Sequence, residues 1–247
     1  MTLIDGLLNS LPEGDIMEVT IGLHWTAVVV SVDGQTRCGL ASTLTSNDGH
    51  FAEPDVALAG RLHTLPGREL AAYARSEQPI EASIGFAAIN ALLPPPGEQQ
   101  LTDVNADEVI AAKGAGKTVV VVGSFPFIPG LRPRVGELLV LERNPGEGEL
   151  PESAAADVIP RADVVAITGM TLVNHSLDSL LSLCSPGATV LLLGASTPLS
   201  PILFDYGVTL LSGAIVTEID PVLRAVRQGA KFRQIHKAGA RLVTMRR

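Results

Sequence analysis

The segment TGMTLVN at residues 168–174 groups small polar residues that can hold a ligand. Thr168, Thr171 and Asn174 follow one another at intervals of three residues. Residues three or four apart lie on one side of a helix, and the first N–H groups of a helix attract anions. The spacing therefore predicts a polar pocket, and helix capping by one hydroxyl is the alternative. The neighbouring His175 faces elsewhere and is interpreted as structural or exposed.

A second polar turn, GASTP at residues 194–198, has the same character. Ser196 and Thr197 can present hydroxyls and backbone donors to an anion, and Pro198 suits the first position of a helix. The same residues suit a plain helix cap. The sequence leaves both interpretations open.

A third turn, GSFPFIP, begins at Gly123 and departs from the dinucleotide fingerprint. That fingerprint needs G-x-G-x-x-G so that the backbone can approach a pyrophosphate, whereas Gly123 is followed by the bulky Phe125 and Pro126. Glu142 nevertheless lies about twenty residues further on, where Rossmann proteins bind a ribose hydroxyl. The alternative is a surface carboxylate paired with Arg143.

Other catalytic and metal motifs do not occur in the sequence. It contains no G-x-S-x-G elbow, no H-E-x-x-H and no cysteine cluster, and its five histidines are scattered. A catalytic triad and an all-protein zinc site are therefore not predicted. The densest group of oxygen ligands is NDGH at 47–50 with Glu53 and Asp55, which is interpreted as a polar loop.

The three polar turns follow apolar segments that the sequence predicts to be strands. Five such segments are 117–123, 137–144, 162–169, 188–196 and 207–213, with helices predicted at 171–184 and 220–228. Continuous apolar strands alternating with helices are typical of a Rossmann-like parallel sheet. Such sheets bind ligands at the carboxyl ends of their strands, near the point where strand order reverses. The polar turns lie at these ends.

The first hundred residues predict a different, α+β module. Strand-like segments at 15–32 and 35–41 flank the Asp33–Gly34 hairpin turn, and helices are predicted at 2–10, 67–76 and 80–93. The prolines at 94–96 end the last helix. We therefore expect an α/β protein with domains at 1–100 and 101–247.

Composition limits the classes of partner. Of the 247 residues, 46% are hydrophobic and 18% are charged, which is typical of a globular protein, and the net charge of −8 argues against nucleic acid as a partner. The most apolar run, Thr118–Val122, is too short to cross a membrane.

Two isolated cysteines and an acidic N-terminus predict a cytoplasmic location. The basic residues after Asp220 either bind an anionic ligand or partner or belong to a helix and strand whose charged side chains face solvent.

The chain resembles a family whose description is heavy-metal chelation. The resemblance is carried by WTAVVV (25–30), GKTVVVVGSFPFIP (116–129), LERNP (141–145), ITGMTLVNHSLDSLLSL (167–183), LLLGASTPLSP (192–201) and LLSGAIV (210–216). It implies a first domain like the N-terminal domain of enolases, a Rossmann-like second domain and a binding site in the cleft between them. The residues that match the family's motifs are Gly123, Phe125, Pro126, Glu142, Asn144, Pro145, Thr168, Gly169, Thr171, Leu172, Asn174, Gly194, Ser196, Thr197 and Pro198.

Two positions depart from the family's pattern. Ala195 stands where the pattern has a proline, and the segment 40–43 lacks a glycine before its final threonine. The first departure changes the stiffness of the loop. The second affects the contribution of the first domain to the cleft.

Three hypotheses of function follow. The first is binding of a heavy metal or metal chelate at the interdomain cleft, with a transition metal or metal complex as ligand. The second is an enzyme that uses S-adenosylmethionine or a nicotinamide nucleotide, favoured by Glu142. The third is a non-catalytic oligomeric scaffold. Whether the protein is an enzyme or a homo-oligomer is left open by the sequence.

Overall fold

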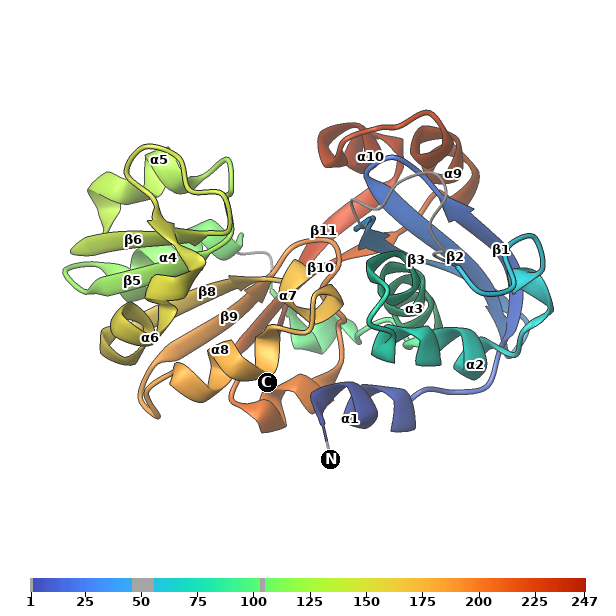
Figure 1. The fold of residues 1–247 in the computed structure, drawn as a ribbon, viewed down its shortest axis with the longest axis horizontal. Coiled ribbons are helices and arrows are strands. Elements are labelled where there is room, and N and C mark those ends of the chain that lie inside the picture. The colour runs from blue at the N-terminus through green and yellow to red at the C-terminus, as the bar shows by residue number, and fades with distance from the viewer. Residues whose placement is uncertain (1, 46–55, 103–104) are drawn as a thin grey trace.

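The computed structural model describes residues 2–45, 56–102 and 105–247. The chain forms a three-stranded antiparallel sheet followed by an eight-stranded, mostly parallel sheet (Figure 1). This architecture confirms the predicted α/β fold class with an α+β module in front of a Rossmann-like sheet. The NDGH segment with Glu53 and Asp55 lies outside the described residues.

The small sheet consists of β1 (Asp15–Ile21), β2 (Trp25–Val32) and β3 (Gln35–Ser42), in that order. The predicted turn is confirmed, since Asp33 and Gly34 have φ values of 51° and 77°, as a two-residue hairpin turn of this kind requires. The segment predicted as one strand at 15–32 is two strands, because the chain reverses between β1 and β2.

Helices cover one face of this small sheet. α3 (Pro79–Leu92) lies on the sheet, and α2 (Gly67–Ala71) and a 3-10 turn at Ala72–Arg75 pack on α3. α1 (Leu3–Asn9) packs on that 3-10 turn and on the helical turn at Pro201–Tyr206. α3 packs on β2 and β3 and is buried almost throughout. It is apolar on nearly all sides, as is typical of a helix enclosed by a protein core.

The large sheet has the strand order β4-β11-β10-β9-β8-β5-β6-β7. Its strands are β4 (Leu101–Thr102), β5 (Thr118–Val122), β6 (Glu137–Glu142), β7 (Leu150–Pro151), β8 (Val164–Thr168), β9 (Thr189–Leu193), β10 (Leu210–Val216) and β11 (Ala240–Arg246). The six strands from β7 to β10 are parallel, whereas β11 is antiparallel to both of its neighbours. In chain order these six strands lie 3-2-1-4-5-6, the classical doubly wound arrangement, whose order reverses between β5 and β8.

Helices lie on both faces of the large sheet (Figure 1). They are α4 (Ala106–Gly114), α5 (Ile128–Leu131), α6 (Ala155–Val158), α7 (Met170–Val173) and α8 (Leu177–Leu183). The helices α9 (Ile219–Arg227) and α10 (Phe232–Ala238) lie between β10 and β11 in the chain and pack on the small sheet. The helix predicted at 171–184 is wrong as one element, because α7 and α8 are separated at residues 174–176. Pro198 does not begin a helix; the next helical turn starts at Pro201.

The two modules share their cores. One buried cluster joins Leu7 and Phe86 of the first module to Val120 and Ile167 of the large sheet. Another packs α9 and α10 against the small sheet, with Val222 and Val226 among its members, and Figure 1 shows these two helices beside β1 and β2. The domain limits at 1–100 and 101–247 remain a prediction, and the C-terminal helices contribute to both modules. Among the described residues, no helix is long and apolar enough to cross a lipid bilayer.

Candidate functional site

The reversal of strand order brings Gly123 against Thr168. Gly123 follows β5 with a φ of 103°, a conformation that side chains rarely adopt. A Cβ at Gly123 would lie 3.0 Å from both Cβ and Cγ2 of Thr168. The backbone can therefore approach the end of β8 only because residue 123 has no side chain.

A second close approach lies one strand further along the sheet. A Cβ at Gly169 would lie 2.6 Å from Oγ1 of Thr197 and 2.9 Å from its backbone nitrogen. The turns after β8 and β9 are therefore in direct contact. The predicted residues Gly123, Thr168, Gly169 and Thr197 are brought together at the carboxyl edge of the sheet, as the resemblance implies.

Ser196 joins the two modules. Its Oγ accepts a hydrogen bond of 2.9 Å from the backbone N–H of Ser42 and lies 3.0 Å from the Ser42 hydroxyl. Asn90 of α3 donates from Nδ2 to the carbonyl oxygens of Leu40, at 2.8 Å, and Ser196, at 3.1 Å. The Ser196 hydroxyl, predicted to face a ligand, is thus engaged within the protein.

The polar residues of 168–174 stabilise the local backbone. The Thr171 hydroxyl donates to the Thr168 carbonyl at 2.7 Å, so Thr171 lies inside α7 and does not cap it. Oδ1 of Asn174 accepts from the backbone and hydroxyl of Ser176, at 3.2 and 2.7 Å. The short turn that these contacts stabilise separates α7 from α8. The bond from the Ser176 N–H to the Asn174 side chain is a common kind of local side-chain-to-backbone contact.

His175 lies in that turn with a φ of 59°, which is uncommon for a residue other than glycine. Its Nε2 is 2.8 Å from the carbonyl oxygen of Ala74. Since a carbonyl only accepts, Nε2 carries a proton and donates to it. The structural interpretation of His175 therefore agrees with its position between the two modules.

The remaining predicted residues lie toward β6. Phe125 stacks on Phe127 with ring centroids 5.1 Å apart, and Pro126 between them is exposed. Glu142 is half-buried at the end of β6, and the exposed Asn144 follows it. Arg143 pairs with Glu152 at 3.5 Å, so the predicted alternative, in which Arg143 neutralises Glu142, is wrong.

A hollow of about 150 Å³ lies where the small sheet meets the carboxyl edge of the large one. We call it the junction hollow; it is lined by residues of β3, the end of α3, the prolines at 94–96, Thr197, Leu199 and the end of β10. Among the described residues, the buried side-chain atoms that lack a hydrogen-bond partner are Nε of Arg37, Oδ1 of Asn90 and Oγ1 of Thr197. All three belong to residues that line this hollow.

The sequence did not indicate Arg37 and Asn90. Asn90 is a polar residue inside an apolar helix, which is the one signal that could have identified it, because polar groups at core positions are retained for a specific partner. Arg37 has no such signal, since an arginine in a strand usually faces solvent.

A bare metal ion needs a cluster of ligands that the described residues do not provide. Structural and soft-metal sites take three or four Cys, His or carboxylate ligands, and the described residues contain no cluster of three such groups. Burial raises the pKa of the Cys38 thiol to about 12 and that of Cys184 to about 11, which opposes the thiolate form that binds metals. The residues that the structure describes do not fit a bare heavy-metal ion.

The comparisons with known proteins agree with the fold. A family model named DUF364 and described as "Putative heavy-metal chelation" matches residues 105–245, and a second model, DUF4213, with the same description, matches residues 4–93. A curated protein of Methanocaldococcus jannaschii, named Uncharacterized protein MJ0500, is 26% identical over 227 residues, which cover 87% of this chain and 86% of that protein.

Two solved structures are similar over their whole length. A protein with unknown function from the DUF364 family of Desulfitobacterium hafniense DCB-2 has a TM-score of 0.85 and 31% identity, covering 99% of this chain and 98% of that one. A DUF364 protein with unknown function from Pyrococcus horikoshii has a TM-score of 0.81 at 21% identity, with both chains fully covered. Since the first model spans more than half of the sequence, the chain belongs to the DUF364 family.

Proposed function

We propose that the protein binds a small hydroxycarboxylate-type molecule, free or as its metal complex, at the junction hollow. The observation that carries this proposal is the set of three unpartnered polar atoms on Arg37, Asn90 and Thr197. Buried polar atoms in native proteins are nearly always hydrogen-bonded, and each one left unpaired costs about 1–3 kcal/mol. A ligand that supplies the missing partners recovers this cost.

The unpartnered atoms of Arg37 and Asn90 indicate the class of ligand. Arg37 Nε only donates, so it needs an acceptor. Asn90 holds its Nδ2 in two hydrogen bonds to carbonyls, so its free Oδ1 needs a donor. Of the described residues that line the hollow, Arg37 is the charged one. An anion with a carboxylate for Arg37 and a hydroxyl for Asn90 meets these requirements, and compounds of this kind are common metal chelators.

The junction hollow is large enough to hold one carboxylate-bearing part of such a molecule and too small to enclose all of it. Sites for complete small-molecule ligands usually measure about 300–1,000 Å³, whereas the junction hollow measures about 150 Å³. The metal of a bound complex would therefore be carried as part of the ligand and held by the chelator's own oxygens. This form of binding agrees with a family description of heavy-metal chelation without needing a protein metal site.

A thermal-shift series tests the proposal. The probes are citrate, Ni²⁺–citrate and Fe³⁺–citrate, compared with Ni²⁺ and Zn²⁺ alone. A ligand at about a thousand times its dissociation constant stabilises the folded state by roughly 4 kcal/mol, which for this size corresponds to a shift on the order of 10 °C. We expect a shift with citrate or its complexes. Shifts with the bare ions alone would contradict the proposal.

Thr197→Val separates binding from stability. The substitution keeps the shape of the side chain and removes a hydroxyl that has no partner, so the free protein should be as stable as the wild type or more so. The citrate-dependent shift should be lost. The matched control is Thr20→Val, which removes a buried hydroxyl bonded to Glu18 at 2.7 Å and should lower stability without changing the shift.

The second candidate function is nucleotide binding at the reversal of strand order. It is favoured by the 3-2-1-4-5-6 order and by Glu142 at the end of β6, beside the turn that starts at Gly123. A thermal shift with S-adenosylmethionine or NAD that Glu142→Ala abolishes would support it. If a nucleoside binds equally well without Glu142, the proposed ribose contact is wrong.

A further inference from the structure

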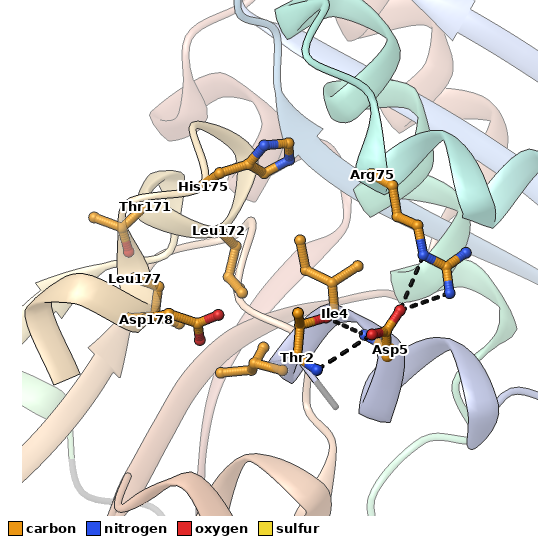
Figure 2. A pocket seen from close by; sticks show the side chains of 10 residues that line it. Thr2, Ile4, Asp5, Arg75, Thr171, Leu172, His175, Leu177 and Asp178 are labelled. Carbon is orange, nitrogen blue, oxygen red and sulfur yellow. Dashed lines mark hydrogen bonds and ion pairs between the residues drawn. The ribbon is translucent and has the colours of Figure 1, made fainter. Parts of the chain in front are cut away.

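A second and larger hollow lies on the surface formed by α1, Arg75, α7 and α8. We call it the α1 hollow; it measures about 360 Å³, within the usual range of small-molecule sites. Figure 2 shows Thr171 and Asp178 on one side of it, Asp5 and Arg75 on the other, and the side chains of Ile4 and Leu172 between them. The two sides come from segments far apart in the sequence.

The positive charge in this hollow is already neutralised. Nε and Nη2 of Arg75 donate to Oδ1 of Asp5 at 3.0 and 2.8 Å. Asp5 is held further by the backbone N–H of Thr2 at 3.2 Å. Because of these contacts, led by the Arg75 hydrogen bond, the pKa of Asp5 falls to about 2. Asp5 and Arg75 therefore form an ion pair that lines one side of the hollow and contributes no net charge.

A hydrogen-bond acceptor on the side of the hollow opposite Asp5 and Arg75 is the carboxylate of Asp178. Asp178 is exposed at the rim of the hollow and makes no hydrogen bond or ion pair with the described residues. His175 is held in place beside the hollow, because its Nε2 donates to the Ala74 carbonyl at 2.8 Å. With Asp5 and Arg75 paired, the Asp178 carboxylate leaves one negative charge among the described lining residues.

The rest of the lining is apolar. Leu3, Ile4, Leu172 and Leu177 contribute aliphatic surface, and Leu172 and Leu177 are buried in the core beneath. Pockets that bind small molecules combine such apolar walls with a few polar groups that fix orientation. Among the described lining residues, the carboxylate without a partner is that of Asp178.

We propose that the α1 hollow is a binding site for a small organic amine, with its ammonium group at the Asp178 carboxylate and its hydrocarbon part against Ile4 and Leu172. An ammonium group has three donors and no acceptor, which complements the Asp178 carboxylate at the rim of the hollow. The site is separate from the junction hollow, where Arg37 is the charged residue of the described lining and favours anions. The proposal does not depend on the function proposed above.

Methyl-detected NMR titration tests this site directly. The probes are butylamine, hexylamine and cyclohexylamine, with hexanol and hexanoate as neutral and anionic counterparts of the same chain. We expect saturable shifts of the Ile4 and Leu172 methyl signals with the amines at millimolar concentration, and no shift of the Leu242 methyl signals on the exposed face of β11. Absence of saturable binding by all three amines, or equal binding of hexanoate, would overturn the proposal.

Substitution of Asp178 provides the second readout. Asp178→Asn should weaken hexylamine binding by about fivefold, the scale of one partly exposed ion pair, and Asp178→Lys should remove it. Since Asp178 is exposed, both variants are expected to fold. The matched control is Asp33→Asn, which removes the same charge at a hairpin turn that accepts asparagine. If Asp33→Asn weakens binding as much as Asp178→Asn, the attraction comes from the overall charge and the site is wrong.

Discussion

Ser42 and Ser196 are 154 residues apart in the sequence, and a single Oγ of Ser196 contacts both the N–H and the hydroxyl of Ser42, at 2.9 and 3.0 Å. The contact joins the last residue of β3 to the turn after β9. Asn90 strengthens it by donating to the Ser196 carbonyl. The carboxyl edge of the parallel sheet is therefore fixed to the first module by polar contacts at the point where the family's motifs converge.

Ser196→Ala should destabilise the folded protein by about 1–3 kcal/mol, the usual cost of leaving a buried partner unsatisfied. The measurement is the free energy of unfolding in urea. Ser182→Ala is the control, because that exposed hydroxyl bonds only to the Ser179 carbonyl of its own helix. An equal effect of the two substitutions would show that the junction contact contributes nothing specific.

Gly169→Ala should also destabilise the protein. The added Cβ would lie 2.6 Å from the Thr197 hydroxyl and 2.9 Å from its nitrogen, so the two turns must separate, at a cost of about 1–3 kcal/mol for overpacking. Gly187→Ala is the matched control, since a Cβ there meets nothing within 4 Å. A wild-type melting temperature for Gly169→Ala would contradict the close contact of the two turns.

The central parallel strands of the large sheet were predictable because their residues form continuous apolar runs, whereas β4, β7 and β11 were not among the predicted strand segments. β5, β6, β8 and β9 lie within the predicted segments, as expected for strands covered on both faces. The break between α7 and α8 was not predictable in the same way. The periodicity of 171–184 is helical, and the Asn174–Ser176 turn that interrupts it depends on the contact of His175 with Ala74 in the other module.

The candidate site could be predicted only by position. Polar turns at strand ends indicated the carboxyl edge, and the structure brings Gly123, Thr168, Gly169 and Thr197 together there. The side-chain partners could not be predicted, because they come from the first module. Ser196 bonds to Ser42, and the unpartnered Thr197 hydroxyl shares a hollow with Arg37 and Asn90. Such contacts depend on how the modules pack, which local patterns do not encode.

The Asp5–Arg75 pair predicts a dependence of stability on pH. The pKa of Asp5 falls to about 2 in the folded protein, below the usual value of about 3.9. A lowered folded-state pKa stabilises the protein above the unfolded pKa, and this contribution disappears as the pH falls from about 4 to about 2. The stability difference between wild type and Asp5→Asn should therefore be largest near neutral pH and vanish toward pH 2. Urea unfolding across this range measures it, and a difference that does not change with pH would contradict the ion pair.

The two cysteines should react slowly and should not bind soft metals. Burial raises the pKa of Cys38 to about 12 and that of Cys184 to about 11, and the thiolate is the reactive and metal-binding form. Labelling with a thiol-specific disulfide reagent at pH 8 should be slow in the folded protein and fast in guanidinium chloride. Cd²⁺ should not shift the melting temperature of the wild type, and the double variant Cys38→Ala/Cys184→Ala should retain the citrate-dependent shift. Tight Cd²⁺ binding that the double variant loses would instead identify a thiolate site and favour a bare-ion mode of heavy-metal binding.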